Sequence, residues 1–242
     1  MTWQEIEPEK LPGATVVVLD VFLATTTLLT AFENGARNVY PVASVEEVEE
    51  VGGKLDQMSL IRGGEQDAQK VDGYDLGPYP EEYNSRVVGG KDVVFVTTNG
   101  TRAIGSAEGA GEVLVGCVRN APAVARYIEE SGTESVYVIC AGSAGRFTME
   151  DFVGASTILA RLNERGYLGE WRLNDAAWMA LDFAARYAGR ETEALKNARA
   201  GQWFLKHGEN AAFDHASTIG ASDTVAAVEE GQLRHIVMEE HG

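Results

Sequence analysis

Short apolar runs alternate along this chain with longer segments in which apolar residues recur every three or four positions. An uninterrupted apolar run rich in β-branched residues predicts a strand buried on both faces, whereas the longer period predicts an amphipathic helix. The apolar runs predict strands at residues 14–19, 38–42, 59–62, 93–96, 112–116 and 135–140. The periodic segments predict helices at residues 24–34, 44–56, 102–110, 121–130 and 149–165. Repeated strand–helix units favour an α/β fold, here a three-layer αβα arrangement with a largely parallel sheet.

The pattern becomes mostly helical after Gly166. Helical spacing continues through residues 174–188 and 191–205, and a short run at 233–238 predicts a last strand at the sheet edge. Residues 66–90 form the longest irregular segment, and loops of this length inside compact domains are usually functional or disordered. The sequence has no internal repeat, low-complexity tract or Pro/Ser linker. We therefore predict a single α/β domain over residues 1–242, with a helical C-terminal portion at about 166–232.

The most informative turn follows the predicted strand at 93–96. Residues 97–101, TTNGT, are small or hydrogen-bonding, and a helix-compatible run begins directly after them. A strand that ends in such a turn and opens a helix directs unpaired backbone N–H groups and a positive dipole end outward. This arrangement suits an anion, with Arg102 as a charged partner. The alternative is a capped helix whose Thr and Asn side chains only satisfy the first turn.

Other polar residues follow the predicted strands at the same edge of the sheet, which is where ligands bind in open α/β folds. Asp20 follows the first strand, Glu65 the third, Arg119 and Asn120 the fifth, and residues 140–146 the sixth. Two acidic strand ends beside N–H-rich turns suit a hard divalent cation that holds a phosphate. The pattern therefore predicts an anion site built on Asp20 and Glu65 and assisted by a divalent cation.

Three more carboxylates could add oxygen ligands to this site: Asp75, Glu150 and Asp151. Sequence alone does not place them in space. Carboxylates at strand ends also cap helices or form salt bridges, so a structural role for Asp20 and Glu65 is the alternative. Zinc is disfavoured because no His/Cys cluster has zinc-ligand spacing.

Composition and charge narrow the partners. The formal net charge is −17 over 242 residues, which would repel nucleic acid and anionic membranes, so neither is expected as a partner. Acidic clusters such as residues 46–50 and an excess of Arg over Lys favour an acidic, halophilic surface, with ordinary acidic solvation as the alternative. No signal peptide or membrane-span pattern is present, and Cys117 and Cys140 are isolated, so we expect a cytoplasmic protein. The oligomeric state is not set by the sequence, and a homo-oligomer stays open.

Several of these motifs occur together in one known family. DVFLATTT at 20–27, GGE at 63–65, GYDLG at 73–77, TTNGTRA at 97–103 and the 140–151 segment resemble, in this order and spacing, the 2-phosphosulfolactate phosphatase family. The resemblance covers about residues 14–162 and is strongest at TTNGTRA. It implies an αβα fold and magnesium-dependent hydrolysis of 2-phosphosulfolactate to sulfolactate and phosphate, a step of coenzyme M biosynthesis. The implied partner is a small phosphorylated, sulfonated organic acid.

The motifs and the strand ends together define the predicted site. We predict Asp20, Glu65 and Arg102 as catalytic residues and Asp20, Glu65 and Asp75 as ligands of a Mg²⁺ cofactor. The predicted substrate-binding residues are Thr25, Thr26, Thr98, Asn99, Gly100, Thr101, Asn120, Gly142, Ser143 and Arg146. Two places depart from the family's usual pattern: Leu23 stands where the family has Arg, and Pro78-Tyr79 stands where it has Asn-Ser.

Other phosphatase mechanisms require different motifs. Asp20 lacks the second acid of the Asp-x-Asp motif, and no segment forms a complete nucleotide P-loop. A cysteine-dependent phosphatase stays open, because Cys140 and Arg146 have the spacing that pairs a thiolate with a phosphate-binding Arg. A non-catalytic anion-binding homologue also stays open, because Leu23 stands in place of the family's positively charged Arg.

Overall fold

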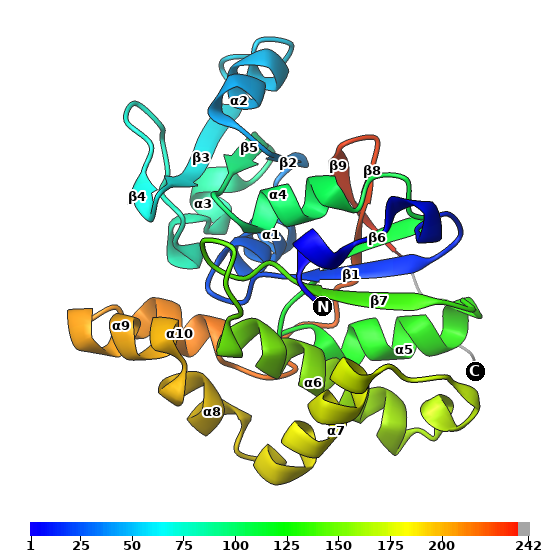
Figure 1. Ribbon diagram of the computed structural model, residues 1–242. Coiled ribbons are helices and arrows are strands. Elements are labelled where there is room, and N and C mark those ends of the chain that lie inside the picture. Colours follow the sequence, from blue (N-terminus) through cyan, green and yellow to red (C-terminus); the bar gives the residue numbers. More distant parts are fainter. Residues whose placement is uncertain (237–242) are drawn as a thin grey trace.

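The computed structural model describes residues 1–236, and its strands form two sheets (Figure 1). The first sheet has five strands in the order β7 (Val136–Cys140), β1 (Thr15–Leu19), β6 (Glu112–Gly116), β8 (Ala226–Glu229) and β9 (Gln232–His235). β1 is parallel to both of its neighbours, while β8 and β9 form an antiparallel hairpin at one edge. β1 is buried along its whole length, as its apolar run predicts.

The second sheet has four strands in the order β2 (Asn38–Val42), β5 (Asp92–Val96), β3 (Leu60–Gln66) and β4 (Gln69–Lys70). The first three are parallel, and β4 folds back antiparallel on the end of β3. All four come from one continuous stretch of chain that lies between β1 and β6 in the sequence. The strands are mostly parallel, as predicted, but they form two sheets where one was expected. Apolar runs identify strands, whereas pairing depends on contacts between distant segments.

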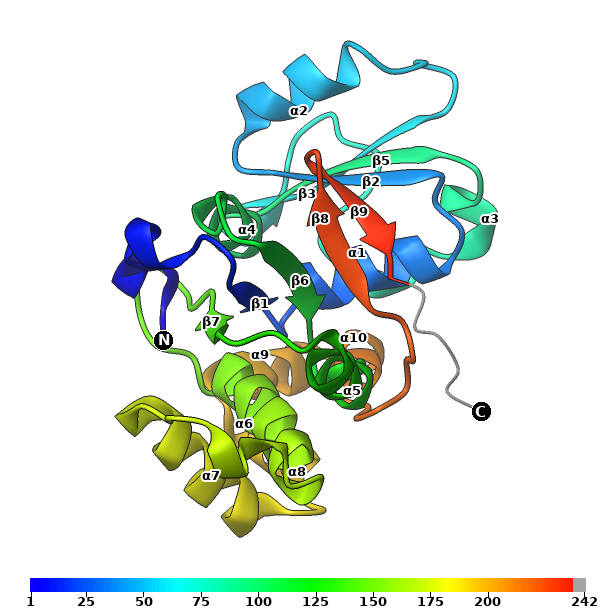
Figure 2. The ribbon, with the colours of Figure 1, turned by 90° about the vertical axis from the view of Figure 1, so that its right-hand side faces the viewer.

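Helices cover both faces of each sheet (Figure 2). α1 (Ala24–Glu33) and α4 (Gly100–Ser106) lie between the sheets and share a core with Val16 of β1 and Phe95 of β5. α5 (Ala121–Ser131) and α6 (Met149–Glu164) pack on the opposite face of the first sheet, and α2 (Val45–Gly52) packs on the outer face of the second. The three-layer α/β architecture expected from the sequence is therefore confirmed for each sheet.

The C-terminal portion is helical, as predicted. It consists of α7 (Asp175–Tyr187), α8 (Glu191–Asn197), α9 (Arg199–His207) and α10 (Asn210–Ala216). α7 packs along α6, whereas α9 and α10 lie beside α6 and α10 contacts the turn at residues 80–82 (Figure 1). The remaining short helices are α3 (Ser85–Val88) and the 3-10 turns Trp3–Glu5, Pro8–Lys10, Pro80–Glu82 and Tyr167–Glu170. Over residues 1–236, no helix combines the length and the apolar character that crossing a membrane requires.

The predicted helix at 191–205 is two helices that meet at Ala198. Ala198 has an extended backbone, with φ −63° and ψ 150°, and it ends α8 and begins α9. A Cβ built on Gly201 would stand only 2.0 Å from the carbonyl oxygen of Leu195, so this close packing of the two helices requires glycine. Helical spacing alone did not reveal the break, because both halves keep apolar residues on their inner faces.

Two other boundaries differ from the prediction. The expected strand at 233–238 is β9, which ends at His235, and residues 237 and 238 lie outside the described part of the chain. The irregular segment 66–90 is ordered by Tyr83, whose side chain is fully buried and whose hydroxyl donates to the Gly77 carbonyl at 2.7 Å. The buried ring of Tyr83 therefore anchors this loop to the core.

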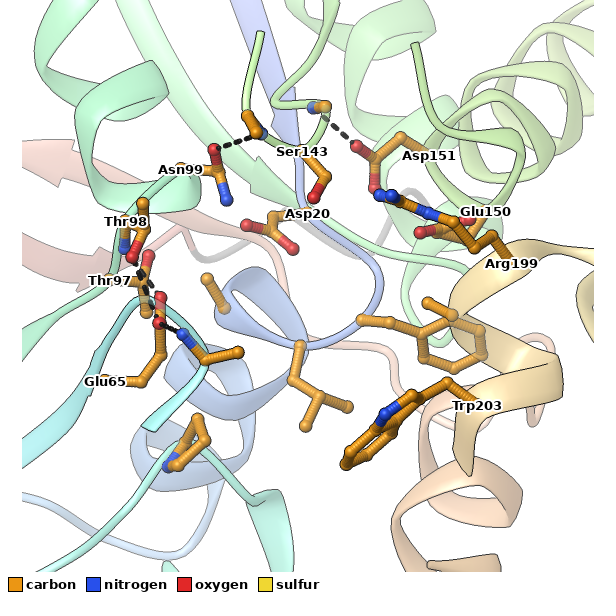
Figure 3. A pocket seen from close by; sticks show the side chains of 18 of the residues that line it. Asp20, Glu65, Thr97, Thr98, Asn99, Ser143, Glu150, Asp151, Arg199 and Trp203 are labelled. Atoms are coloured by element: carbon orange, nitrogen blue, oxygen red, sulfur yellow. Dashed lines mark hydrogen bonds between the residues drawn. The ribbon is translucent and has the colours of Figure 1, made fainter. Parts of the chain in front are cut away.

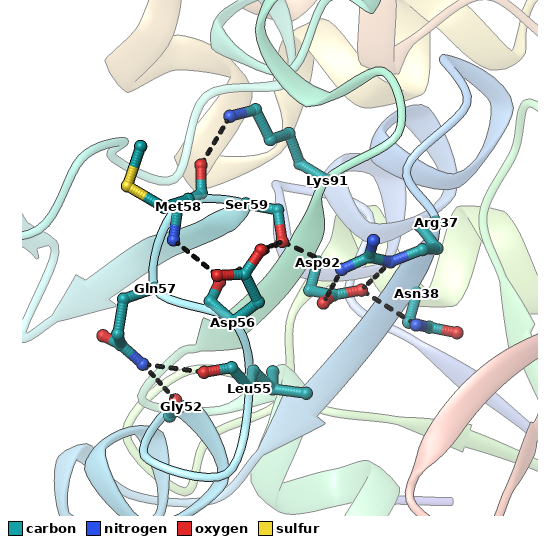
Figure 4. A network of polar contacts seen from close by, with 10 residues as sticks. All are labelled: Arg37, Asn38, Gly52, Leu55, Asp56, Gln57, Met58, Ser59, Lys91 and Asp92. Atoms are coloured by element: carbon teal, nitrogen blue, oxygen red, sulfur yellow. Dashed lines mark hydrogen bonds and ion pairs between the residues drawn. The ribbon is translucent and has the colours of Figure 1, made fainter.

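A polar network joins the starts of β2 and β5 (Figure 4). Asp92 is buried, and its carboxylate accepts hydrogen bonds from Arg37 Nε at 2.9 Å and Asn38 Nδ2 at 2.8 Å. The Arg37 guanidinium also donates to Ser59 at 2.9 Å, at the start of β3. The hydrogen bonds from Arg37 lower the pKa of Asp92, outweighing its burial. The network therefore fixes the alignment of all three parallel strands at their amino ends.

Candidate active site

A cleft of about 510 Å³ lies at the carboxyl ends of strands from both sheets (Figure 3). Asp20 comes from the end of β1, Glu65 from β3, residues 97–99 from the turn after β5, and residues 142–144 from the loop after β7. The beginning of α6 and one face of α9 complete the lining. The cleft occupies the position predicted from the strand ends, although these ends belong to two sheets.

Asp20 lies at the centre of this cleft. Its side chain is nearly buried, and a Cβ on Gly100 would stand 2.6 Å from its Oδ2. Gly100 is therefore required for α4 to begin directly against this carboxylate. Burial raises the pKa of Asp20 well above its ordinary value, and the negative charges of Asp151 and Glu65 raise it further. A cation that enters the cleft would stabilise the ionised form of this carboxyl group.

Glu65 is held in place by the turn after β5. Its carboxylate accepts hydrogen bonds from the Thr98 backbone N–H at 2.6 Å, the Thr98 hydroxyl at 3.0 Å and the Ala68 backbone N–H at 2.6 Å. The Thr98 N–H that was predicted to face an anionic ligand thus binds a protein carboxylate. Glu65 and Thr98 act together as one acidic wall of the cleft.

Glu150 and Asp151 stand in the first turn of α6, on the opposite side. Asp151 accepts hydrogen bonds from the backbone N–H groups of Val21 and Gly142, each at 2.9 Å, and from the Thr148 hydroxyl at 2.7 Å. It therefore links the segments that follow β1 and β7. Burial raises the pKa of Asp151 despite these hydrogen bonds. Glu150 is buried too, and its Oε2 has no hydrogen-bond partner among the described residues.

The donor atoms of this cleft fit Mg²⁺ in type. Asp20, Glu65 and Glu150 supply carboxylate oxygens, which hard cations prefer. The Oε2 atom of Glu150 has no hydrogen-bond donor among the described residues, and a cation could take the place of that donor. Over residues 1–236, no three His, Cys, Asp or Glu side chains stand close enough together to hold a metal ion by themselves. Mg²⁺ commonly uses only one or two carboxylates and completes its shell with water and substrate phosphate. An open set of this kind matches that preference.

Four of the predicted substrate-binding residues line the cleft: Thr98, Asn99, Gly142 and Ser143. The Asn99 side-chain oxygen accepts a hydrogen bond from the Ala144 N–H at 3.2 Å, which leaves its amide nitrogen on the side of Asp20 (Figure 3). Ser143 faces Asn99 across the upper part of the cleft (Figure 3). These side chains are placed to donate hydrogen bonds to an anionic ligand.

Four other predicted residues are buried and bonded to the protein itself. The hydroxyls of Thr25 and Thr26 donate to the carbonyls of Asp20 and Val21, each at 2.9 Å. The Thr101 hydroxyl donates to the Thr97 carbonyl at 2.9 Å. Asn120 donates to the Val115 carbonyl at 3.0 Å and accepts from Cys117 N–H at 2.9 Å. The structure gives these residues a supporting role: they fix the turns that present Asp20 and Thr98.

Three predicted charged residues do not line the cleft. Arg102 is exposed, and its Nε faces the Ala43 carbonyl at 3.5 Å. Arg146 is also exposed, in the loop after β7. Asp75 accepts a hydrogen bond from Arg62 N–H at 2.8 Å, so it stabilises the edge of β3. These positions do not bring Arg102, Arg146 or Asp75 together with Asp20.

One wall of the cleft includes a helix that was not predicted to take part in the site. It comes from α9, with Arg199, Ala200, Trp203 and Phe204, and from the apolar residues Phe22, Leu23, Pro78 and Tyr79. The Phe22 ring packs on Phe204 at 5.4 Å between centroids, which joins the segment after β1 to α9. The sequence signal for the α9 part of this wall is the pair Arg199 and Trp203, four residues apart and hence on one helical face.

Cys140, the nucleophile of the alternative mechanism, lies outside the cleft lining. It is buried beside Val17 and Ile158 in the core between the first sheet and α6. Burial raises the pKa of its thiol to about 12, and the negative charge of Asp151 contributes. A neutral, buried thiol does not act as a nucleophile, so this geometry disfavours a cysteine mechanism.

Sequence comparison places this site in a known family. The family model described as 2-phosphosulpholactate phosphatase matches residues 1–231. The chain belongs to the 2-phosphosulfolactate phosphatase family. It is 35% identical over 233 residues to a protein of Clostridium perfringens (strain 13 / Type A) named "Probable 2-phosphosulfolactate phosphatase", across 96% of this chain and 92% of that one.

Two other relatives carry the same name. The protein of Symbiobacterium thermophilum is 35% identical over 225 residues, 93% of this chain and 95% of the relative. The protein of Caldanaerobacter subterraneus subsp. tengcongensis is 41% identical over 161 residues, 66% of each chain. Leu23 and Pro78-Tyr79, where the sequence was expected to depart from the phosphatase family's usual pattern, all line the cleft.

Proposed function

We propose that this protein is a magnesium-dependent phosphomonoester hydrolase that converts 2-phosphosulfolactate, or a phosphorylated organic acid close to it, to the free hydroxy acid and phosphate. The observation that carries the proposal is the convergence of Asp20 and Glu65, from the strand ends of two different sheets, on one cleft. Membership of the phosphatase family supports the reaction class.

Asp20 is the residue that would hold Mg²⁺ directly, with Glu65 and Glu150 on opposite walls of the same cleft. When bound, the ion would polarise the phosphoryl oxygens and neutralise their charge. The ion would stabilise the charged form of Asp20, whose pKa is raised by burial and by neighbouring carboxylates in the protein alone. Glu65 enters the cleft already oriented by two donors from Thr98.

The remaining residues orient the phosphate and the loops around it. Asn99 and Ser143 are placed to donate to phosphoryl oxygens, while Asp151 holds the Val21 and Gly142 backbone groups in fixed positions. Such prepositioned donors lower the barrier, since they need no reorganisation as charge develops. No covalent intermediate on the protein is needed in this scheme.

Phosphate release from 2-phosphosulfolactate, measured with and without Mg²⁺, tests the proposal. We expect EDTA to abolish turnover and Asp20→Asn to lower kcat by roughly 10²–10³-fold, by analogy with the loss of one prepositioned electrostatic contact. Asp75→Asn is a matched control, because it removes a carboxylate outside the cleft. Turnover that survives both EDTA and Asp20→Asn would exclude the metal mechanism. Anion binding without any phosphate release would instead identify a non-catalytic homologue.

A further inference from the structure

The charges that line the cleft are distributed unevenly. Its acidic lining residues are Asp20, Glu65, Asp67, Glu150 and Asp151. Arg199 is the one Lys or Arg that lines it within the described part of the chain. A substrate that carries a second negative group besides its phosphate therefore meets a single favourable place for that group.

Arg199 is available for this contact. It is the first residue of α9, it is exposed, and it forms no ion pair within residues 1–236. Its side chain extends into the cleft towards Glu150 and Asp151 (Figure 3). Burial raises the pKa of Glu150, and the positive charge of Arg199 opposes part of this rise. A guanidinium with unused donors binds carboxylate or sulfonate oxygens well, because its donors form a rigid fork.

The surface beside Arg199 is apolar and well packed. Trp203 stands one turn further along α9, 46% exposed, on the same side as Arg199. Leu23 and Tyr79 continue this surface, and the Tyr79 ring packs edge-on against Phe204 at 6.4 Å. A short carbon chain that joins two anionic groups can lie on this surface without leaving a polar group unsatisfied.

We infer that Arg199 binds the second acidic group of the substrate, with the phosphate directed towards Asp20 and Glu65 and the carbon chain against Leu23 and Trp203. Arg199 is thus a specificity residue for phosphorylated organic acids. The inference rests on the proposed phosphatase function and assigns its substrate class to a particular side chain. It also gives α9 a function: this helix selects the substrate, while the strand ends carry the chemistry.

Three phosphomonoesters distinguish recognition of the acidic group from recognition of the phosphate. Ethyl phosphate has no second acidic group, phospholactate has a carboxylate, and 2-sulfoethyl phosphate has a sulfonate. We expect Arg199→Gln to raise KM for the acidic esters by roughly 10- to 100-fold, the range for loss of a charge-assisted hydrogen bond, and to leave ethyl phosphate nearly unchanged. Arg199→Lys should lie between Gln and wild type. Lys206→Gln is the matched control, because it removes a positive charge from the exposed side of the same helix.

Equal losses on all three esters would overturn the inference, because Arg199 would then bind phosphate. Unchanged KM values would overturn it as well. A change confined to one acidic ester would support it and identify the acid that Arg199 recognises. Since Arg199 is exposed, its replacement leaves the apolar cores intact, and thermal melts verify this for each variant.

Calorimetric binding of sulfolactate, without Mg²⁺ or a phosphate group, separates this inference from the proposed reaction. We expect wild-type protein and Lys206→Gln to bind sulfolactate and Arg199→Gln to bind it roughly tenfold or more weakly. That result would stand even if no ester were hydrolysed, in which case the proposed function alone would fail. Absence of wild-type binding, or equal binding by Arg199→Gln, would overturn the inference.

Discussion

Gly100 and Arg102 illustrate how side-chain direction decides which residues reach the cleft. Gly100 faces the carboxylate of Asp20. Arg102 follows two positions later in α4, roughly 200° further round the helix, and is exposed on the other side. The TTNGTRA motif predicted the location of the turn but not the direction of each side chain. Gly100 was expected to bind the substrate, and in the structure it allows the close approach of the Asp20 carboxylate.

Asp20 and Glu65 were predictable because strand ends in α/β folds meet ligands, and both line the cleft. Thr25, Thr26 and Asn120 were not distinguishable from them by residue type. A hydroxyl or amide at a strand end can bind a ligand or cap the backbone, and the sequence does not say which partner is closer. Here the backbone carbonyls are the partners.

The state of Cys140 gives a prediction about mechanism. Cys140→Ser should retain at least about half of the wild-type kcat and its full dependence on Mg²⁺, because the thiol is buried, carries a pKa of about 12 and lies outside the cleft. Phosphate release with and without EDTA is the measurement. Cys117→Ser, at a second buried cysteine, controls for any loss of stability. An inactive Cys140→Ser variant that folds normally, together with EDTA-resistant wild-type activity, would favour the cysteine mechanism.

At the scale of elements, apolar runs predicted most strands well. β2 and β6 begin and end at the predicted residues, and β1 and β7 begin one residue later. Strands buried on both faces leave an uninterrupted apolar signal, which explains this agreement. The break between α8 and α9 was missed, because it depends on the close approach of Gly201 to Leu195. That break is what places Arg199 at a helix start within the cleft.

The Arg37–Asp92 pair that aligns β2 with β5 gives a prediction about stability and pH. Arg37→Ala leaves a buried carboxylate without its cation and should lower the free energy of unfolding at pH 7, seen as a lower denaturation midpoint. Adding Asp92→Asn should restore part of this loss. Chemical denaturation of the two variants measures both effects.

The sign of the pH effect follows from the lowered pKa of Asp92 in the folded protein. Asp92 binds a proton more readily in the unfolded chain than in the folded protein. The stability that the pair contributes is therefore complete above the unfolded Asp92 pKa of roughly 3.9 and is lost as pH falls through the folded pKa. Wild-type protein should therefore lose more stability than Arg37→Ala on acidification from pH 5 to pH 3. Parallel stability curves for the two proteins would contradict this account of the pair.

At the scale of the whole molecule, strand–helix alternation predicted the architecture but not the number of sheets. Each strand carries its own apolar signal, whereas the choice of neighbours depends on contacts between segments far apart in the chain. The wall formed by α9 was hidden for the same reason, since Arg199 lies far along the chain from Asp20. Local patterns predict elements, and the cleft is a property of their assembly.

The net charge of −17 gives a prediction for the whole molecule. Repulsion among acidic groups destabilises the folded state at low ionic strength, and molar salt shortens the screening length to about 3 Å. We expect Tm to rise by about 4 °C or more between dilute buffer and molar KCl, equivalent to roughly 1–2 kcal/mol. Melts recorded with EDTA exclude a contribution from divalent cations. Coincident melting curves would remove the case for a salt-adapted surface.

The second sheet is made entirely by a stretch of chain inserted between β1 and β6. Glu65 belongs to this insertion, while Asp20 and Asp151 belong to the surrounding chain. The separation of the carboxylates is therefore set by how the two sheets rest on α1 and α4. Catalytic alignment in this protein is a property of its buried middle layer. A change of side-chain volume at Leu28 or Ile104, which belong to the core of that layer, can therefore lower kcat without altering any residue of the cleft.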